Sequence, residues 1–271
     1  MNISGIPLLS KARLKRYLKL HQKKCRDTEG LFLAEGLRTV RELCMSMPSA
    51  ELLEALLIRE GSVHDLGFAG KWKERICSMT ESDFSRLAGT STSQGIIGVF
   101  RKPDEEQAER HDAGKEKTAS FIIAFDDLQD PGNAGTIMRT AAWFGCDALI
   151  CSRGSADPYN AKSVRSSAGS IFSLNLSLTA NLHEELERLA EEGFAIVAAS
   201  LGGRDFREFD SWPAKLVLVI GNEANGVSGP VQQLAHRLVR IPHKGSVPRV
   251  ESLNASVAAA ILIERLVLGQ G

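Results

Sequence analysis

Apolar residues divide the chain into two parts with different patterns. In the first part, short apolar runs alternate with stretches in which apolar residues recur at helical spacing, as at 37–45 and 81–89. This alternation predicts a small α/β domain. The strands that it predicts lie at 30–36, 52–60, 75–80 and 94–102.

The second part alternates continuous apolar runs with helical patterns from residue 121 onward. Continuous apolar strands separated by helices are typical of a mainly parallel sheet that is covered by helices on both faces. In such sheets ligands bind beyond the carboxyl ends of the strands, so we expect the functional residues in the loops that follow the strands. The predicted strands lie at 121–125, 147–151, 172–178, 195–200, 216–221 and 238–241.

Residues 103–118 separate the two parts. They contain many charges and almost no bulky apolar side chain, which predicts an exposed linker. A chain of 271 residues has room for two domains of about 100 to 150 residues each. We therefore expect an N-terminal α/β domain at 1–102 and a C-terminal α/β domain at 119–271.

Composition narrows the class of protein. Hydrophobic residues make up 43% and charged residues 24% of the chain, which is typical of a soluble globular protein. The five cysteines include no Cys-x-x-Cys pair, so we expect neither a disulfide framework nor a metal site. No window approaches the ~18 apolar residues of a membrane span, and no signal peptide is evident. These features favour a cytoplasmic protein.

The formal net charge is zero, but the charge is unevenly distributed. Residues 1–26 carry eight Lys or Arg and no Asp or Glu, and Leu14, Tyr17 and Leu18 recur there at helical spacing. This predicts a basic amphipathic helix over 11–26. Its charged face is either simply solvated, or contacts a nucleic-acid phosphate backbone, or lies on a membrane surface. The candidate RNA contacts in this helix are Lys11, Arg13, Lys15 and Arg16.

The sequence Asp-Pro-Gly-Asn-Ala-Gly at 130–135 leads from a predicted strand into a helix. A dinucleotide site needs a third glycine and a P-loop needs Gly-Lys-Ser or Gly-Lys-Thr, and neither is present. Asn133 is of a residue type that is favoured at N-caps, so we expect it to cap the helix. Arg139 lies in this otherwise apolar helix, which is expected to pack on the sheet. An arginine there needs a partner, for which an RNA phosphate is suitable.

Two later stretches also join a strand to a helix through a loop. One runs from a buried strand into Gly221, Asn222 and Glu223. The other runs from Ile241 through a loop to Ser252, a suitable N-cap, and then into a helix rich in small residues. Taken singly, each stretch is explained by capping and packing alone.

In their order along the chain, the three stretches resemble the motifs of the SpoU (TrmH-like) family of S-adenosylmethionine-dependent RNA 2'-O-ribose methyltransferases, in the SPOUT class. The similar segments are "DPGNAGTIMRTAAWFG" at 130–145, "LVIGNEANGVS" at 218–228, and "IPHKG" with "VESLNASVAAAI" at 241–261. Residues 157–172 are also similar to the family. Residues 24–40 and 91–99 resemble the substrate-binding domain that is often fused to it, which is similar to ribosomal protein L30e.

The resemblance implies a fold, an assembly and a cofactor. The C-terminal domain would contain a trefoil knot, and the protein would be a homodimer whose active sites lie at the subunit interface. The cofactor would be S-adenosylmethionine, and the implied contacts to it are Gly221, Ile241, Leu253, Ala199, Ser200 and Leu201. The residues implied around the reacting ribose are Arg139, Asn133, Glu223, Ser252 and Asn254.

The implied reaction transfers a methyl group from a sulfonium to a ribose 2'-hydroxyl, which requires alignment of that oxygen and removal of its proton. A guanidinium is a poor proton acceptor because its pKa is above ~12. We therefore expect Arg139 to bind the adjacent phosphate and to stabilise charge on the 2'-oxygen, while phosphate or water takes the proton. Further candidate contacts to the RNA backbone are Lys162, Arg165, Lys244 and Arg249.

One departure from the family pattern lies in the third motif. The segment Ser-Val-Pro-Arg-Val between Gly245 and Glu251 makes this loop longer than in the usual pattern. The leading prediction is a methyltransferase that acts on a 23S-like rRNA. A tRNA methyltransferase is the nearest alternative, and a catalytically silent protein that binds structured RNA is an alternative from another class.

Overall fold

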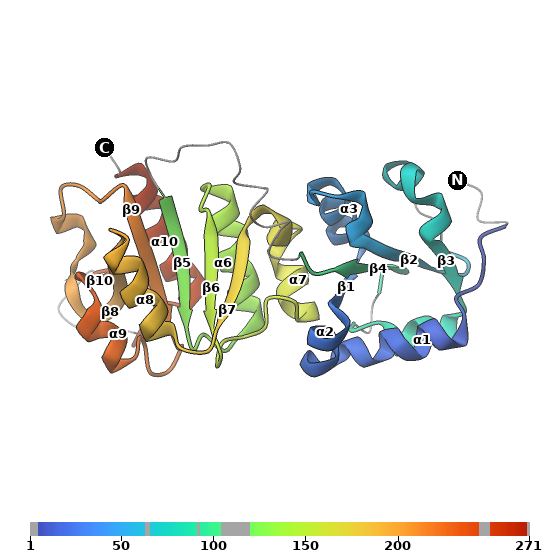
Figure 1. Cartoon of the computed structure of the whole chain (residues 1–271), viewed down its shortest axis with the longest axis horizontal. Coiled ribbons are helices and arrows are strands. Elements are labelled where there is room, and N and C mark those ends of the chain that lie inside the picture. Colours follow the sequence, from blue (N-terminus) through green and yellow to red (C-terminus); the bar gives the residue numbers. More distant parts are fainter. Residues whose placement is uncertain (1–4, 63–65, 91–92, 104–119, 244–249, 270–271) are drawn as a thin grey trace. The chain divides into compact units, whose positions relative to one another are not determined.

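The computed structural model describes residues 5–62, 66–90, 93–103, 120–243 and 250–269 (Figure 1). The chain divides into two compact units, and both are α/β structures, as predicted. Unit 1 comprises Met1–Ala113 with Asp157–Ser173, and unit 2 comprises Gly114–Ala156 with Leu174–Gly271.

Unit 1 is built on a four-stranded mixed sheet with the strand order β1-β4-β2-β3. β4 pairs antiparallel with β1 and β2, while β3 pairs parallel with β2. All four strands coincide with predicted apolar runs. The strands are β1 (Leu31–Glu35), β2 (Leu53–Arg59), β3 (Ile76–Met79) and β4 (Ile96–Arg101), and the α-helices are α1 (Lys11–Leu18), α2 (Lys23–Glu29), α3 (Leu37–Ser46), α4 (Glu81–Leu87) and α7 (Ala161–Ser167).

The basic helix predicted at 11–26 is interrupted in the structure. A short 3-10 turn and the extended residue Gln22 separate α1 from α2. Leu20 in this turn is buried in the core of unit 1, which fixes the position of the break. The guanidinium of Arg26 donates to the backbone carbonyl oxygens of Leu20 and His21 at 2.8 and 3.0 Å. It thereby satisfies acceptors that the interrupted helix leaves without an intrahelical donor.

The segment Asp157–Ser173 packs within unit 1, whereas the sequence-based boundary places it in the C-terminal domain. A buried ion pair of 2.6 Å joins Arg26 of α2 to Asp157. The ring centroids of Phe32 on β1 and Tyr159 lie 5.1 Å apart. Breaking a buried ion pair is costly, so the pair and the ring contact together hold this segment in unit 1.

Unit 2 contains a six-stranded sheet with the order β10-β8-β9-β5-β6-β7, in which all neighbouring strands are parallel. This confirms the prediction of a mainly parallel sheet. The strand expected at 172–178 begins only at Asn175, because Ser170–Ser173 form a 3-10 turn. The strands are β5 (Ser120–Asp126), β6 (Ala148–Ser152), β7 (Asn175–Thr179), β8 (Ala195–Asp205), β9 (Lys215–Gly221) and β10 (Arg237–Arg240), and the α-helices are α6 (Pro131–Trp143), α8 (Leu182–Glu191), α9 (Gly229–Leu234) and α10 (Ala255–Leu268).

Helices cover both faces of this sheet (Figure 1). α8 and α9 share an apolar core with one face, to which Leu186 and Val231 contribute from the helices and Ile196 and Val217 from the strands. α6 packs against α10 on the other face. No helix in the described ranges is long and apolar enough to cross a membrane. The expected trefoil knot stays a prediction, because residues 244–249 of the third motif lie outside the described part of the chain.

Candidate active site

The loops that follow β5 and β9 meet at the carboxylate of Glu223. This carboxylate accepts hydrogen bonds of 3.0 Å from the backbone N–H groups of Gln129 and Asp130. It also accepts a hydrogen bond of 3.0 Å from the side-chain amide of Asn133. β5 and β9 are neighbours in the sheet, so their carboxyl ends bring the two loops together. Two of the predicted catalytic residues, Asn133 and Glu223, are therefore in contact.

Asn133 lies in the first turn of α6 but does not cap this helix. The N-cap is Asp130, whose carboxylate accepts a hydrogen bond of 2.8 Å from the backbone N–H of Asn133. The prediction that Asn133 caps the helix is therefore wrong. Pro131 at the start of the helix is the sequence signal for a cap at the preceding residue. The side chain of Asn133 instead bridges two loops, since its Nδ2 donates to Glu223 and its Oδ1 accepts from Asn254.

Asn254 is the N-cap of α10. Its Oδ1 accepts hydrogen bonds from the backbone N–H groups of Ser256 and Val257 at 3.0 and 3.3 Å. Its Nδ2 donates to Asn133 at 3.0 Å. The prediction of Ser252 as the cap is wrong, because the chain becomes helical only after Asn254. One side chain thus fixes both the start of α10 and the position of Asn133.

A tight turn after β9 orients Glu223. The backbones of Asn222 and Gly226 exchange two hydrogen bonds, of 3.0 and 2.9 Å. The side-chain oxygen of Asn222 also accepts from the backbone N–H of Ala224 at 2.9 Å. Gly221 is needed before this turn, because a Cβ there would lie 2.2 Å from the backbone of Gly226. The turn is therefore closely packed, and it holds Glu223 toward the loop after β5.

A cavity of about 620 Å³ lies beside the middle of β8, at the carboxyl ends of β9 and β10, and at the start of α10. Its walls include all six residues predicted to contact the cofactor and three of those predicted around the ribose. The roles of these nine residues stay predictions, but the structure brings the residues together. They are Ala199, Ser200, Leu201, Gly221, Ile241, Leu253, Glu223, Ser252 and Asn254.

Several other residues of the cavity are not evident from the sequence. Arg240 and His243 line it on either side of Ile241. Arg240 lies near the end of the strand predicted at 238–241 and His243 lies just beyond it, and this position was the available signal. Ala258 and Leu262 of α10 also line the cavity, but a helix rich in small residues does not reveal which of its sides faces a ligand.

The electrostatics of Glu223 follow from its partners. Burial raises the pKa of this carboxyl group, but hydrogen bonds from Asn133, Gln129 and Asp130 stabilise the charged form and outweigh burial, so the net pKa is lowered. Glu223 is therefore a carboxylate at neutral pH. A carboxylate with a lowered pKa and three donors is a poor general base. Its chemistry suits the positioning of its neighbours.

Arg139 is exposed on α6 and does not line the cavity. It makes no hydrogen bond or ion pair with the residues that the structure describes. The partner that an arginine in an otherwise apolar helix was expected to need is not provided within the described residues, because position 139 is exposed. Trp143, one turn later on the same face, is 85% exposed. α6 thus presents a guanidinium and an indole on its outer face.

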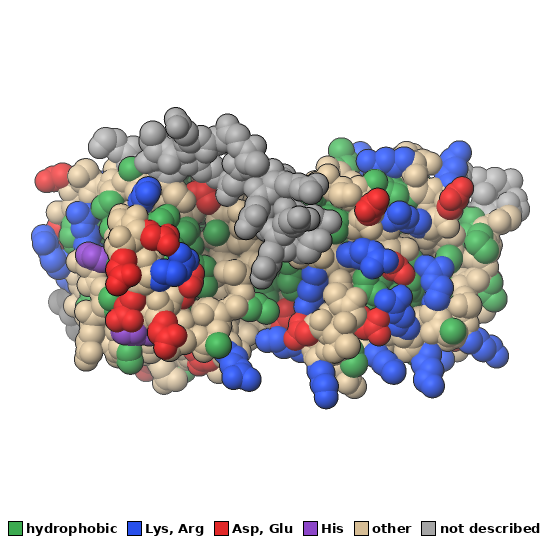
Figure 2. All heavy atoms as spheres, in the orientation of Figure 1, with side chains coloured by type: hydrophobic (Ala, Val, Ile, Leu, Met, Phe, Trp, Pro, Cys, Tyr) green, Lys and Arg blue, Asp and Glu red, His purple; other side chains and the backbone are tan. Residues whose placement is uncertain are grey.

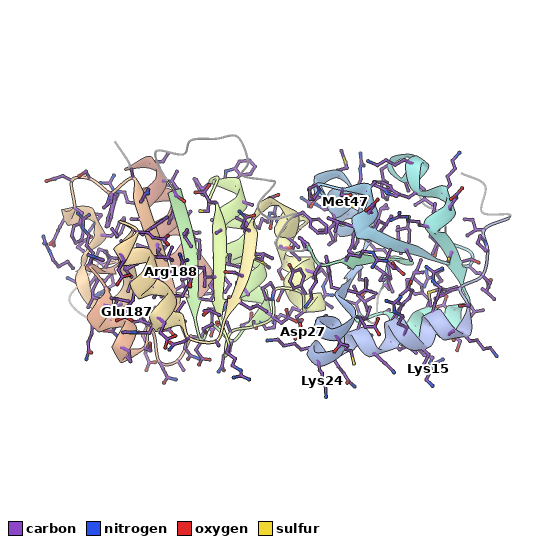
Figure 3. The ribbon with its side chains drawn as sticks, viewed as in Figure 1. Lys15, Lys24, Asp27, Met47, Glu187 and Arg188 are labelled. Carbon is purple, nitrogen blue, oxygen red and sulfur yellow. The ribbon has the colours of Figure 1, made fainter. Side chains whose placement is uncertain are left out.

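The RNA contacts predicted in α1 differ in their surroundings. Lys11 and Lys15 are exposed, and Figure 3 shows Lys15 pointing away from α1. Arg13 donates to a tyrosine hydroxyl at 3.0 Å, and Arg16 forms an ion pair of 2.7 Å with Glu29. Figure 2 shows many Lys and Arg side chains along the face of unit 1 that carries α1 and α2. The two lysines are therefore more available to an external anion than the two arginines.

The other predicted RNA contacts lie in α7 or outside the described residues. Lys162 is exposed on α7, while Arg165 has a buried guanidinium nitrogen without a hydrogen-bond partner among the described residues. Lys244 and Arg249 lie outside the described part of the chain. The described ranges contain no group of His, Cys, Asp and Glu side chains that could hold a metal ion, and no disulfide joins the cysteines there.

The part of the chain that carries the three motifs matches a known family. Residues 120–264 match the SpoU rRNA Methylase family. The chain belongs to this family. Residues 11–98 match the MRM3-like substrate binding domain, so the two matches together account for most of both units.

Relatives within the SpoU family are similar over nearly the whole chain. The 23S rRNA (guanosine(2553)-2'-O)-methyltransferase RlmP of Bacillus subtilis (strain 168) is 32% identical over 258 residues, which cover 94% of this chain and 95% of that protein. The AdoMet-bound rRNA methyltransferase from Sinorhizobium meliloti has a TM-score of 0.75 at 27% identity, covering 95% of each chain. The SpoU methyltransferase AviRb from Streptomyces viridochromogenes, in complex with the cofactor AdoMet, has a TM-score of 0.81 at 25% identity, covering 96% of this chain and 98% of that one.

Proposed function

We propose that this protein is an S-adenosylmethionine-dependent methyltransferase that modifies a ribose 2'-hydroxyl in rRNA. The observation that carries the proposal is the hydrogen-bonded network of Glu223, Asn133 and Asn254 beside a cavity of about 620 Å³. Each of these residues belongs to a different family motif, so the network unites the three motifs at one place. The B. subtilis relative is named for 2'-O-methylation of 23S rRNA, which favours rRNA over tRNA as the substrate.

The cavity suits S-adenosylmethionine in size and in lining. Small-molecule sites commonly have volumes of about 300 to 1,000 Å³ and combine apolar walls with a few polar groups. Ile220, Leu253 and Leu262 supply apolar wall here, while Glu223 and Glu251 supply carboxylates whose charge suits a sulfonium cation. When bound, the cofactor supplies the methyl group.

The polar side chains beside the cavity are proposed to position the ribose. Ser252 lines the cavity, and Asn254 and Asn133 hold each other through their amides. Glu223, already charged and bound to three donors, maintains this arrangement instead of accepting the 2'-hydroxyl proton. Phosphate or water would take the proton.

A homodimer is proposed to complete the site. α6 and α10 pack together and expose Trp143, Val257 and Leu268, which are 85%, 48% and 71% exposed. An exposed apolar surface of this kind favours association with a second copy of the chain. Arg139 lies beside Trp143 and outside the cavity of its own subunit. It would therefore act on RNA bound at the cavity of the second copy.

The N-terminal unit is proposed to bind the RNA substrate. Its exposed Lys11 and Lys15 would contact the phosphate backbone, whereas the partly paired Arg13 and Arg16 would contribute less. Lys162 on α7 is a further exposed candidate. Arg165, Lys244 and Arg249 remain candidate contacts. The lack of disulfides among the described cysteines and an rRNA substrate favour the cytoplasm as the place of action.

Incubation of the purified protein with tritiated S-adenosylmethionine and separate RNA fractions tests the proposal. The fractions are rRNA, ribosomal assembly intermediates and tRNA. Alkali-resistant dinucleotides labelled in rRNA or in an assembly intermediate are the expected result, because a 2'-O-methyl group blocks alkaline cleavage. Label in tRNA alone would overturn the choice of substrate. Absence of cofactor binding by calorimetry, with RNA binding retained, would instead establish the silent RNA-binding alternative.

A further inference from the structure

Two arginines and two aromatic rings of unit 2 form a cluster that does not line the cavity. The guanidinium carbons of Arg204 and Arg237 each lie 4.9 Å from the ring centroid of Phe209. Arg237 also lies 5.1 Å from the ring of Trp212, whose centroid is 5.1 Å from that of Phe209. These distances are within the range of favourable cation–π contacts. The elements that carry two of these residues or contact the cluster, namely β8, β10 and α10, also build the cavity.

The first of these elements is β8, which leaves and rejoins its partner strand. Ala198 pairs with Leu238 of β10, and the next paired residue is Arg204 with Val239. Residues 199–203 therefore have no partner in this ladder. Three of them, Ala199 to Leu201, line the cavity. The excursion at 199–203 forms one wall, and its return to the sheet is fixed at Arg204.

The return of the chain is sterically tight. A Cβ on Gly203 would lie 2.5 Å from the backbone of Leu238, so the backbone of the excursion packs directly on β10. Because Gly203 has no side chain, it cannot itself hold this contact in place. The next residue, Arg204, reaches Phe209, and Phe209 is also covered by Arg237 from the first position of β10. The cluster thus joins both strands at the point where the excursion closes.

The second element is α10, whose first turns line the cavity. The backbone N–H of Trp212 donates to the carbonyl oxygen of Gly269 at the end of this helix, at 3.1 Å. A Cβ on Gly269 would lie 2.7 Å from the Trp212 ring, so the indole packs on the helix end. Trp212 is 4% exposed. Through Trp212 and Arg237, the cluster also connects α10 to β10.

The ion pair that Arg204 forms does not take over the role of its contact with the Phe209 ring. Arg204 pairs with Glu208 at 3.4 Å, and both side chains are more than half exposed. Solvent screening makes such pairs weak. Contact with the Phe209 ring is therefore the principal packing interaction of the Arg204 guanidinium.

We infer that Phe209 is a positioning residue for the cofactor cavity. It holds the returning end of residues 199–203 through Arg204 and Arg237, although it touches neither the cavity nor its occupant. This inference rests on the proposed function, because it assigns Phe209 an effect on affinity for S-adenosylmethionine. The effect arises before any chemistry, so it belongs to binding and not to turnover.

The test is calorimetric titration of S-adenosylmethionine into the full-length protein and its variants. Phe209→Leu keeps an apolar side chain but removes the ring, and is expected to raise the Kd about fivefold through the loss of two cation–π contacts. Phe209→Tyr keeps the ring and should bind within about twofold of the wild type, since it preserves the same contacts. Hydrogen exchange of the backbone amides at 199–203, measured without cofactor, should become faster in Phe209→Leu but not in Phe209→Tyr.

Phe194→Leu is the matched control. Its ring lies 5.7 Å from the ammonium group of Lys215 in the same unit, and Phe194 does not line the cavity or contact the cluster. Its removal costs a cation–π contact elsewhere and should leave the Kd unchanged. An equal rise in Kd for Phe194→Leu would show a general loss of stability and would overturn the inference.

Arg204→Met provides an independent arm, because this side chain is exposed and its replacement should not prevent folding. It is expected to raise the Kd two- to fivefold, and the double variant with Phe209→Leu should bind no more weakly than Phe209→Leu alone, within about twofold. Wild-type Kd values for both Phe209→Leu and Arg204→Met would overturn the inference while leaving the proposed function intact. Failure of the wild-type protein to bind the cofactor would overturn the proposed function and the inference with it.

Discussion

Asn133 donates a hydrogen bond of 3.0 Å to Glu223, although 90 residues separate them in the chain. The orientation of the Asn133 amide is fixed by this bond, because its other end accepts from Asn254. Glu223 is ionised and can only accept, and the Oδ1 of Asn254 is occupied by its own helix. Each member of the network therefore has one fixed set of donor and acceptor roles. Replacement of the Asn133 amide by a carboxylate is a sensitive test of this arrangement.

Asn133→Asp should destabilise unit 2. Aspartate removes the donor and places a second carboxylate beside Glu223, so we expect the free energy of unfolding at neutral pH to fall by about 2 kcal/mol. Urea denaturation measures the change. Thr136→Asp is the control, because Thr136 is exposed on the same helix and the added charge has no carboxylate partner there. It should change stability by less than ~0.5 kcal/mol. Equal losses for both variants would contradict the role of Asn133.

Glu223 should make stability depend on pH in the acid range. Its pKa is lowered in the folded protein, so its contribution is present at pH values above its usual pKa of 4.5 and is lost as the pH falls through the lower folded value. Glu223→Gln has no group to titrate. The difference in unfolding free energy between the wild type and Glu223→Gln should therefore be largest near neutral pH and shrink on acidification.

Urea denaturation at a series of pH values from neutral to strongly acid measures this difference. Glu191→Gln removes the same charge from an exposed position on α8, and should show no comparable trend. A difference between the wild type and Glu223→Gln that is the same at every pH would show that the charged form of Glu223 is not what its donors stabilise.

Asn254 should matter for stability and Ser252 should not. Asn254→Ala loses the N-cap of α10 and the donor to Asn133, for an expected destabilisation of about 1 to 2 kcal/mol. Asn254→Ser restores a capping oxygen but not the amide donor, so its stability should be intermediate. The side chain of Ser252 has no hydrogen bond with the described residues, and Ser252→Ala should stay within ~0.5 kcal/mol of the wild type. Thermal unfolding followed by circular dichroism can rank the three variants, and a large loss for Ser252→Ala would revise the cap assignment.

RNA binding should depend on salt through the lysines of α1. Lys11→Gln combined with Lys15→Gln removes two exposed cations, and should reduce the slope of log affinity against log salt by roughly 1.5. Filter binding to the methylated RNA fraction at several salt concentrations measures the slope. Lys71→Gln with Lys73→Gln removes two exposed lysines from another element of unit 1 and should leave it unchanged. Equal effects of the two pairs would mean that binding responds only to net charge.

Most strands were predictable because they coincide with apolar runs, and a parallel sheet buried on both faces requires such runs. β7 differs, since its sequence alternates polar and apolar residues and it begins later than predicted. β8 differs because it extends further than predicted. Its apolar run ends near Ala198, and it continues to Asp205 only because Arg204 pairs with Val239 on a strand that comes later in the chain. The membership of Asp157–Ser173 in unit 1 depends on a pair with Arg26, 131 residues away. Local pattern carries no information about partners so distant.

The site was predictable as a set of loops but not as a set of contacts. The motifs placed Asn133, Glu223 and Asn254 after strands whose ends meet, and all three are joined in the structure. The cap of α6 was missed although Pro131 indicated it. The exposure of Arg139 could not be inferred from its apolar neighbours, because one of them, Trp143, is itself exposed.

Arg139→Ala should separate cofactor binding from turnover. Arg139 does not line the cavity, so the Kd for S-adenosylmethionine measured by calorimetry should stay within about twofold of the wild type. Turnover at saturating cofactor should fall by a factor of about 100 or more if the guanidinium stabilises negative charge on the 2'-oxygen and holds the neighbouring phosphate. Arg188→Ala, an exposed arginine on α8, is the control and should retain full activity.

If Arg139 acts at the cavity of a second copy, a heterodimer of Arg139→Ala with a subunit whose cavity is blocked should retain one working site. Normal turnover by Arg139→Ala with weakened cofactor binding would reverse the assigned role, because it would place the guanidinium at the cofactor instead of at the RNA.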